Sequence, residues 1–364
     1  MARTYISLNR FLVGEEQLKL MYKQYEACRI NMKTGGVYSI DNRIFPCNLY
    51  LEEDDTIYAR VNNITNMNHW LASRVLSLDR ENAKAILNSC SMKQAITDKD
   101  RALVAMQYRA LSLQDSYWIE DDNEEIAWDE INLFDNSLSN AVVDISLLGR
   151  NLTVTNSSLI APDCSTAGVF AKAWVRNGET LWLYKGDKDD SVRKEVEASE
   201  ILRLLGLDVV EYRYGEWKGH KVSMCKLFTT KDMGYVTAEE YAMNNDLPMR
   251  GKEYYTMILA DYLVGNSDRH WGNWGYMAKA NSIIGFAPIF DFNHAFEANE
   301  ENICKPEQLY GETVSEIEAA SRALKVVEYK HGVSLRQFMY GEFTEQRIAE
   351  LEAYMIRKES YEEK

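Results

Sequence analysis

The sequence predicts an α+β fold in which a β-rich half is followed by a mostly helical half. Residues 171–185 and 207–228 each contain two apolar segments joined by a short turn, which is typical of antiparallel strand pairs. Residues 252–264 are apolar on nearly all sides and Gly265 follows them, as expected of a buried helix with its C-cap. Residues 1–139 contain both kinds of pattern, so we expect an additional mixed α/β region there.

The N-terminal accessory region is expected to contain strands and helices. Residues 15–28 are predicted to form a helix, because their apolar side chains recur every three or four positions. Residues 48–51 and 56–61 alternate as strands do. Two helices should follow, the first capped by Asp79 and the second beginning at Thr97. This region contains no catalytic pattern.

The rest of the chain is divided into two halves by the same patterns. Residues 140–228 are expected to form the β-rich half, and residues 229–364 the helical half. A hairpin is predicted for residues 273–287. Further helices are predicted at residues 195–205, 238–243, 315–324, 334–340 and 344–357.

Charge and composition exclude several classes of protein. The net charge of −15 argues against direct binding of nucleic acid or of an anionic membrane. The sequence contains no apolar run of membrane-spanning length, and its start lacks a signal-peptide pattern. The six cysteines are scattered without a CxxC motif, which indicates reduced thiols. We therefore expect a cytoplasmic protein, with a secreted effector as the alternative.

A short polar loop between apolar segments carries the residues with the clearest chemistry. It contains Asp268, His270 and Asn273, and Asp291 follows after the predicted hairpin. In kinases, one carboxylate accepts a hydroxyl proton, while an amide and a second carboxylate hold Mg²⁺ against ATP phosphates. The hairpin would bring Asn273 and Asp291 to one metal ion. His270 is interpreted as a supporting residue, because Mg²⁺ prefers oxygen ligands. A polar surface loop is the alternative interpretation.

Lys185 and Glu195 form a second candidate pair upstream of this loop. Lys185 ends an apolar strand, and Glu195 lies near the start of the next predicted helix. Kinases use a strand lysine paired with a helix glutamate to hold ATP phosphates. Glu197 or Glu200 could replace Glu195 as the partner, and a lysine at the protein surface is the alternative interpretation.

Two further segments are candidates for contacts with a nucleotide. Ser165, Thr166 and Gly168 could bring backbone N–H groups and hydroxyls to phosphates, and Lys172 could add a charge. An ordinary turn is the alternative, since this is not a Walker A sequence. The backbone from Cys225 to Leu227 is expected to form a hinge beside the adenine ring.

The catalytic segment resembles a known family. Residues 265–273, Gly-Asn-Ser-Asp-Arg-His-Trp-Gly-Asn, and residues 291–293, Asp-Phe-Asn, resemble the catalytic and metal motifs of HipA-like serine/threonine protein kinases. The loop also resembles that of phosphoinositide kinases. The resemblance covers residues 140–345 and implies a bilobed protein-kinase-like fold that uses ATP and Mg²⁺.

The resemblance also implies individual roles. Asp268 would be the catalytic base, Asn273 and Asp291 the metal ligands, and Lys185 a phosphate contact. Ser165 matches a position at which family members can be autophosphorylated and thereby silenced.

The predicted function is phosphoryl transfer from ATP to serine or threonine hydroxyls of a protein substrate. The alternatives are a kinase of a lipid or small molecule and an ATP-binding pseudokinase scaffold. The acidic composition disfavours a lipid head group. Residues 1–139 do not match the antitoxin-contacting domain of toxin-type members, although a regulatory or antitoxin-like protein partner there is an expectation.

Overall fold

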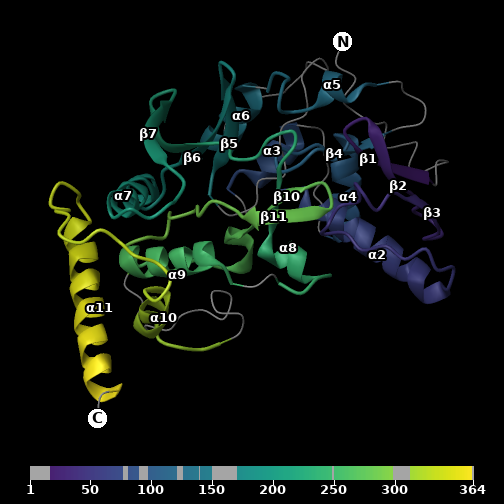
Figure 1. Cartoon of the computed structure of the whole chain (residues 1–364). Coiled ribbons are helices and arrows are strands. Elements are labelled where there is room, and N and C mark those ends of the chain that lie inside the picture. Colours follow the sequence, from purple (N-terminus) through teal and green to yellow (C-terminus); the bar gives the residue numbers. More distant parts are fainter. Residues whose placement is uncertain are drawn as a thin grey trace.

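The computed structural model describes residues 17–76, 81–89, 97–120, 126–138, 140–149, 170–247, 250–297 and 312–362. Within these residues the chain forms antiparallel sheets and helices, which confirms the α+β fold class (Figure 1). None of the described helices is long and apolar enough to cross a membrane.

The N-terminal region is built on a sheet with strand order β3-β2-β1-β4. Its strands are β1 (Gln17–Tyr22), β2 (Tyr25–Asn31), β3 (Val37–Ile40) and β4 (Tyr117–Glu120). Its helices are α2 (Ile57–Ser73), α3 (Ala83–Ser89) and α4 (Asp98–Gln107), and α2 lies beside α4 (Figure 1). Two short helices follow, α5 (Trp128–Ile131) and α6 (Asn140–Leu148).

The predicted helix at residues 15–28 is wrong. Its described residues form the β1–β2 hairpin, and Lys23 takes a positive φ of 53° in the turn. Leu18 and Leu20 are buried at alternate positions, which is the period of a strand. The helical spacing in the sequence arises because apolar residues from two strands are read across the turn.

The predicted strands at residues 48–51 and 56–61 are also wrong. Residues 48–51 are irregular, and Thr56 is the N-cap of α2, accepting a hydrogen bond at Oγ1 from Ala59 N at 3.2 Å. The helix predicted from Thr97 is confirmed, because Thr97 and Asp100 form a capping box at the start of α4. The predicted cap Asp79 lies outside the described residues.

The β-rich half has strand order β5-β6-β8-β7. The strands are β5 (Lys172–Asn177), β6 (Thr180–Gly186), β7 (Tyr212–Trp217) and β8 (His220–Lys226), which confirms both predicted pairs. Helix α7 (Ser191–Leu204) packs against this sheet and confirms the helix predicted at residues 195–205.

The helical half begins with β9 (Gly234–Thr237) and α8 (Ala238–Ala242). Helix α9 (Lys252–Val264) is buried and ends at Gly265 in the left-handed region, as predicted. The 3₁₀ turn η1 (Trp271–Asn273), the hairpin β10 (Gly275–Lys279) and β11 (Ser282–Phe286), and helices α10 (Glu316–Ala323) and α11 (Gly341–Glu362) complete the described part.

The predicted helix at residues 334–340 is wrong. The chain forms separate turns there, and the backbone N–H of Leu335 donates to Glu345 Oε1 of α11 at 3.0 Å. The contact with α11 outweighs the local helical pattern.

Clusters of buried side chains hold the described parts of the chain together. One lies within the N-terminal region. A larger one joins α7, α9 and α10 to the sheet of the β-rich half and to the three-stranded sheet of order β11-β10-β9. A smaller cluster contains Leu113 and Trp118 of the N-terminal region together with Leu181 of β6. The N-terminal region therefore packs directly against the β-rich half.

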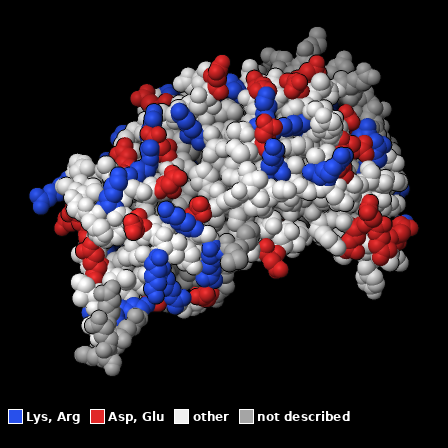
Figure 2. All heavy atoms as spheres, in the orientation of Figure 1, with Lys and Arg blue, Asp and Glu red and all other residues white. Residues whose placement is uncertain are grey.

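The described surface shows both signs of charge. Figure 2 shows acidic side chains gathered beside α2, whereas basic and acidic side chains are interspersed over the rest of this face. Glu53, Asp54 and Asp55, which precede α2 in the sequence, are exposed.

Candidate active site

A cleft lies between the β-rich half and the helical half. This is the bilobed arrangement that the resemblance implies. The β-rich half contributes strands β5, β6 and β8, and the helical half contributes η1 and the segment ending at Asp291. Lining residues include Lys172, Trp174, Leu183, Lys185, Tyr212, Cys225, Leu227, Thr237, Asn273, Phe290 and Asp291.

Lys185 contacts two carboxylates at the wall of the cleft. Its Nζ lies 2.5 Å from Glu195 Oε1 of α7 and 2.7 Å from Asp291 Oδ1. The second oxygen of Glu195 accepts a hydrogen bond from Ser223 Oγ on β8 at 2.5 Å. Glu195 is 1% exposed, so the pair is buried. The structure thus pairs Lys185 with Glu195 and not with Glu197 or Glu200.

The charges of this cluster support one another. Burial alone would lower the pKa of Lys185, but the carboxylates of Asp291 and Glu195 raise it above its ordinary value. Burial opposes ionisation of Asp291, yet Lys185 and then Lys172 outweigh it and lower the pKa of Asp291 well below the usual range. Burial raises the pKa of Glu195. Asp291 is therefore held ionised, the state that a metal ligand requires.

Arg269 fixes the polar loop to the segment that carries Asp291. Its fully buried guanidinium contacts both carboxylate oxygens of Asp261, at 2.9 and 3.0 Å. It also donates to the carbonyl oxygens of Asn273 at 2.7 Å and Phe290 at 2.5 Å. Arg269 therefore holds the backbone of Asn273 and the backbone of Phe290, the residue before Asp291, so one side chain fixes both metal-binding candidates.

Sequence reasoning missed this role of Asp261. One signal was present: Asp261 is an acidic residue within an otherwise apolar run, and a buried carboxylate requires a partner.

The other predicted loop residues have distinct surroundings. Asn273 lines the cleft, and its Nδ2 donates to the carbonyl oxygen of Asp268 at 2.9 Å. Asp268 is half-buried and is not among the described residues that line the cleft. His270 is exposed, and its Nδ1 accepts a hydrogen bond from Gly272 N at 3.0 Å, which caps η1. The contact of His270 is structural, and the catalytic roles of Asp268 and His270 stay predictions.

The donor set fits Mg²⁺ only in part. Asp291 supplies a carboxylate, and the bond from Asn273 Nδ2 leaves the Asn273 amide oxygen as its metal-binding atom. Among the described residues, no group of three or more His, Cys, Asp or Glu side chains is placed to hold a metal ion. A magnesium ion does not require such a group, because it is usually bound by one or two carboxylates together with substrate phosphates.

The remaining predicted contacts are only partly described. Ser165, Thr166 and Gly168 lie outside the described residues. Lys172 is 8% exposed and lies directly opposite Lys185 in the register of β5 and β6. Both cations therefore line the same cleft.

The backbone of the predicted hinge is used in part by the sheet. Cys225 and Leu227 line the cleft, but the backbone N–H of Leu227 donates to Leu181 O at 2.9 Å. That amide extends the sheet, so it is not an adenine donor.

Comparison with known proteins agrees with the chemistry of the cleft. The chain is 33% identical over 125 residues to the serine/threonine-protein kinase CtkA of Helicobacter pylori strain J99, and the match covers 27% of this chain. Over these residues the chain is therefore similar to a serine/threonine-protein kinase. The match spans 38% of the length of CtkA. No family model matches the sequence.

Two solved structures are similar to parts of the chain. The crystal structure of the H. pylori proinflammatory kinase CtkA has a TM-score of 0.31 at 29% identity, covering 34% of this chain and 55% of that one. HipA of Shewanella oneidensis, in a complex of HipA, HipB and operator DNA, has a TM-score of 0.48 at 13% identity, covering 76% and 75%. Both TM-scores lie below 0.5, so neither superposition adds to the sequence match.

Proposed function

We propose that this chain transfers a phosphoryl group from ATP, with Mg²⁺, to serine or threonine hydroxyls of a protein. The observation that carries the proposal is the buried contact of Lys185 with both Glu195 and Asp291 beside the cleft. A lysine in this position binds phosphate oxygens while the helix glutamate orients it. The match to a serine/threonine-protein kinase supports a protein hydroxyl as the acceptor.

Each residue of the site has a defined task in this proposal. Lys185 and Lys172 contact phosphate oxygens from the β-rich half. Asn273 and Asp291 hold Mg²⁺, which when bound would neutralise charge on the phosphates. Asp268 accepts the proton of the attacking hydroxyl.

The proposal extends to residues 165–168, which precede β5 in the sequence, because Lys172 at the start of β5 lines the cleft. Backbone groups near Thr166 and Gly168 would then lie beside phosphates, and Ser165 would be an autophosphorylation site. A phosphate on Ser165 would add negative charge to a segment that must bind phosphates, and would lower activity.

A regulatory protein partner for residues 1–139 is also part of the proposal. Ile57 and Tyr58 at the start of α2 are 79% and 84% exposed, and they adjoin exposed acidic residues. Exposed apolar side chains with a charged rim are common at protein interfaces.

The test compares wild type with Asp268→Ala and Asp291→Ala, using labelled ATP, Mg²⁺ and a generic protein substrate. We expect transfer by the wild type and a loss of about 10²-fold or more in each variant. Intact-mass measurement of the wild type after incubation should show one added phosphate, absent in Ser165→Ala.

Equal ATP binding by all three proteins without any transfer would instead support a pseudokinase scaffold. Transfer to a lipid or small molecule, but to no protein, would support the other enzyme class.

A further inference from the structure

A short segment of the N-terminal region crosses to the helical half and borders the cleft. Residues 111–116, which we name the crossing segment, connect α4 to β4. Thr229 Oγ1 donates to Leu113 O at 2.5 Å, and the backbone N–H of Tyr235 donates to Gln114 O at 2.7 Å. Ser116 Oγ donates to Lys231 O at 2.8 Å. The crossing segment is therefore bonded to the chain directly after the predicted hinge.

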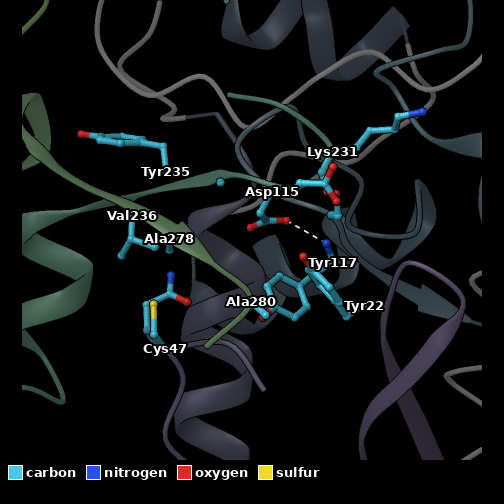
Figure 3. Close-up of a pocket in the computed structure, with 13 residues that line it drawn as sticks. Tyr22, Cys47, Asp115, Tyr117, Lys231, Tyr235, Val236, Ala278 and Ala280 are labelled. Atoms are coloured by element: carbon cyan, nitrogen blue, oxygen red, sulfur yellow. Dashed lines mark hydrogen bonds between the residues drawn. The ribbon is translucent and has the colours of Figure 1, made fainter. Parts of the chain in front are cut away.

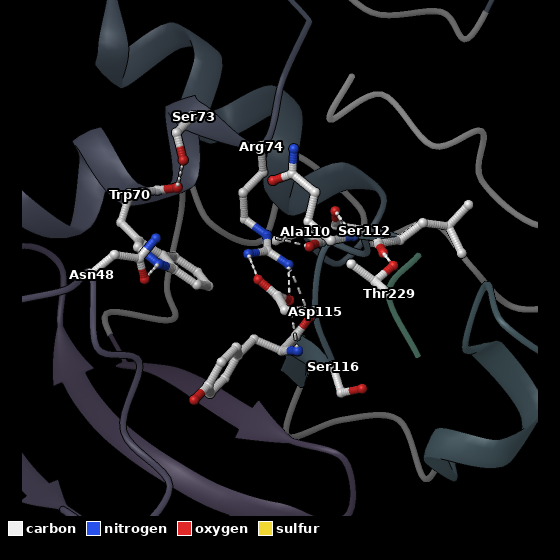
Figure 4. A network of polar contacts seen from close by, with 12 residues as sticks. Asn48, Trp70, Ser73, Arg74, Ala110, Ser112, Asp115, Ser116 and Thr229 are labelled. Atoms are coloured by element: carbon white, nitrogen blue, oxygen red, sulfur yellow. Dashed lines mark hydrogen bonds and ion pairs between the residues drawn. The ribbon is translucent and has the colours of Figure 1, made fainter. Parts of the chain in front are cut away.

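An ion pair between the buried Arg74 and the half-buried Asp115 holds the crossing segment from the other side. Arg74, just after α2, contacts both oxygens of Asp115 at 2.8 and 2.6 Å and donates from Nε to Ala110 O at 2.6 Å (Figure 4). Its guanidinium lies 4.4 Å from the ring centroid of Trp70, and Arg74 is 4% exposed. A bidentate pair fixes both distance and direction, so Arg74 at the end of α2 sets the position of Asp115.

The contact with β9 leaves no spare room. A Cβ built on Gly234 would lie 2.8 Å from Gln114 O and 3.1 Å from Asp115 Cβ. A small cavity between the N-terminal region and the helical half is lined by residues from both, among them Asp115, Tyr117, Lys231, Val236 and Ala280, which Figure 3 labels. The N-terminal region and the helical half thus approach each other closely along β9.

Two residues of the crossing segment reach the candidate nucleotide site. Leu113 and Gln114 line the same cleft as Lys185 and Asp291. Leu113 packs in one cluster with Leu181 and Leu227 of the β-rich half. The cations that would bind phosphates are on β5 and β6, whereas Leu113 and Gln114 are bonded to the segment after β8. They therefore belong to the end of the cleft where the hinge and the base would lie.

We propose that Leu113 and Gln114 form part of the nucleotide-binding site, and that Arg74 and Asp115 are a positioning pair that holds them there. Leu113 supplies apolar contact to the base, and the Gln114 side chain contributes a polar contact at the same end. The inference rests on the proposed function. The N-terminal region would then be a component of the site. Its residues Leu113 and Gln114 would contribute affinity for the nucleoside, whereas the cations of β5 and β6 would contribute affinity for the phosphates.

The test is calorimetric binding of adenosine and of ADP with Mg²⁺ to the full chain. Gln114→Ala and Asp115→Asn should each weaken binding of both ligands by about fivefold, the factor that corresponds to one average lost contact. Lys185→Ala should weaken binding of ADP and not of adenosine. Asp55→Asn is the matched control, because it removes the carboxylate from an exposed pair with Arg60 of α2.

A second readout separates positioning from general damage. Both crossing-segment variants should raise the KM for ATP and leave kcat at saturating ATP unchanged. If Asp115→Asn lowers Tm, its kinetics cannot be assigned to positioning, and the kinetics of Gln114→Ala then test the inference. Gln114→Ala removes a half-buried side chain that itself lines the cleft.

Wild-type affinity for adenosine in a Gln114→Ala protein of wild-type Tm would overturn the inference. A wild type that binds both ligands but transfers no phosphate would contradict the proposed function alone.

Discussion

At the scale of single residues, Lys185 is the point at which three elements meet. It lies on β6, and its ammonium joins Glu195 of α7 to Asp291 of the segment after β11. Two carboxylates share one cation, so removal of either leaves Lys185 with a partner. The loss of Glu195 should therefore affect the direction of Lys185 more than its charge.

We predict that Glu195→Gln lowers kcat/KM for phosphoryl transfer by about 10- to 100-fold, because Lys185 would turn toward Asp291 and away from phosphate. Steady-state kinetics with ATP as the varied substrate measures the effect. Glu200→Gln, at an exposed position of the same helix, is the control and should retain wild-type kinetics. Equal kcat/KM for the two variants would show that the buried pair is not used.

At the scale of elements, α7 is attached to the helical half at several points. Lys194 Nζ contacts Glu297 Oε1 at 3.0 Å, and Ser267 Oγ of the polar loop donates to Glu297 Oε2 at 2.7 Å. Glu197 Oε2 accepts from the backbone N–H of Tyr340 at 3.0 Å. Glu297 thus links α7, which carries Glu195, to the residue before Asp268. The position of α7 is set from the helical half as well as from its own sheet.

We predict that Glu297→Gln lowers kcat by about three- to tenfold while the protein stays folded, because one charged contact of α7 becomes a neutral one. Turnover at saturating ATP, with Tm as a check on folding, measures this. Glu328→Gln, an exposed change in the same half, should leave kcat unaltered. Unchanged turnover in Glu297→Gln would mean that α7 is held well enough by its other contacts.

At the scale of the whole molecule, α11 lies at the far edge of the helical half and is joined to it partly by charge (Figure 1). Glu318 of α10 accepts hydrogen bonds from Tyr354, Lys358 and Arg322. Burial opposes its ionisation, but these three donors lower the pKa of Glu318 to about 2. The carboxylate therefore stabilises the docked helix while it is ionised.

The sign of this effect gives a pH prediction. Because the pKa is lower in the folded protein than its unfolded value of about 4.3, the stabilisation is complete above that value and is lost as the pH falls toward 2. Glu318→Gln should lower the free energy of unfolding by about 1 kcal/mol at pH 7, discounted for solvent screening. Thermal unfolding of both proteins measures it, and the difference should shrink at pH 3. A difference that is equal at both pH values would contradict this assignment.

The parts of this molecule that could be predicted are those determined by neighbours in sequence. Alternation within residues 171–185 and the apolar run before Gly265 indicate their elements directly, and these predictions are confirmed. The pairing of Lys185 with Glu195 follows from a strand and a helix close in sequence.

The parts that could not be predicted depend on distant segments. The β1–β2 hairpin is completed by β4, about a hundred residues later, so its local pattern was ambiguous. Thr56 begins a segment that alternates as a strand does, but this segment is the start of α2, which packs on the distant α4. The contact of Thr229 with Leu113 joins residues that no local pattern connects.

The lining of the cleft by Leu113 and Gln114 also bears on chemical inhibition. A small molecule that fills the cleft as far as these side chains would contact two residues of the N-terminal region, in addition to residues of the β-rich and helical halves. Its selectivity could then be adjusted through groups placed against positions 113 and 114, with no change to the part of the compound that occupies the space beside Lys185.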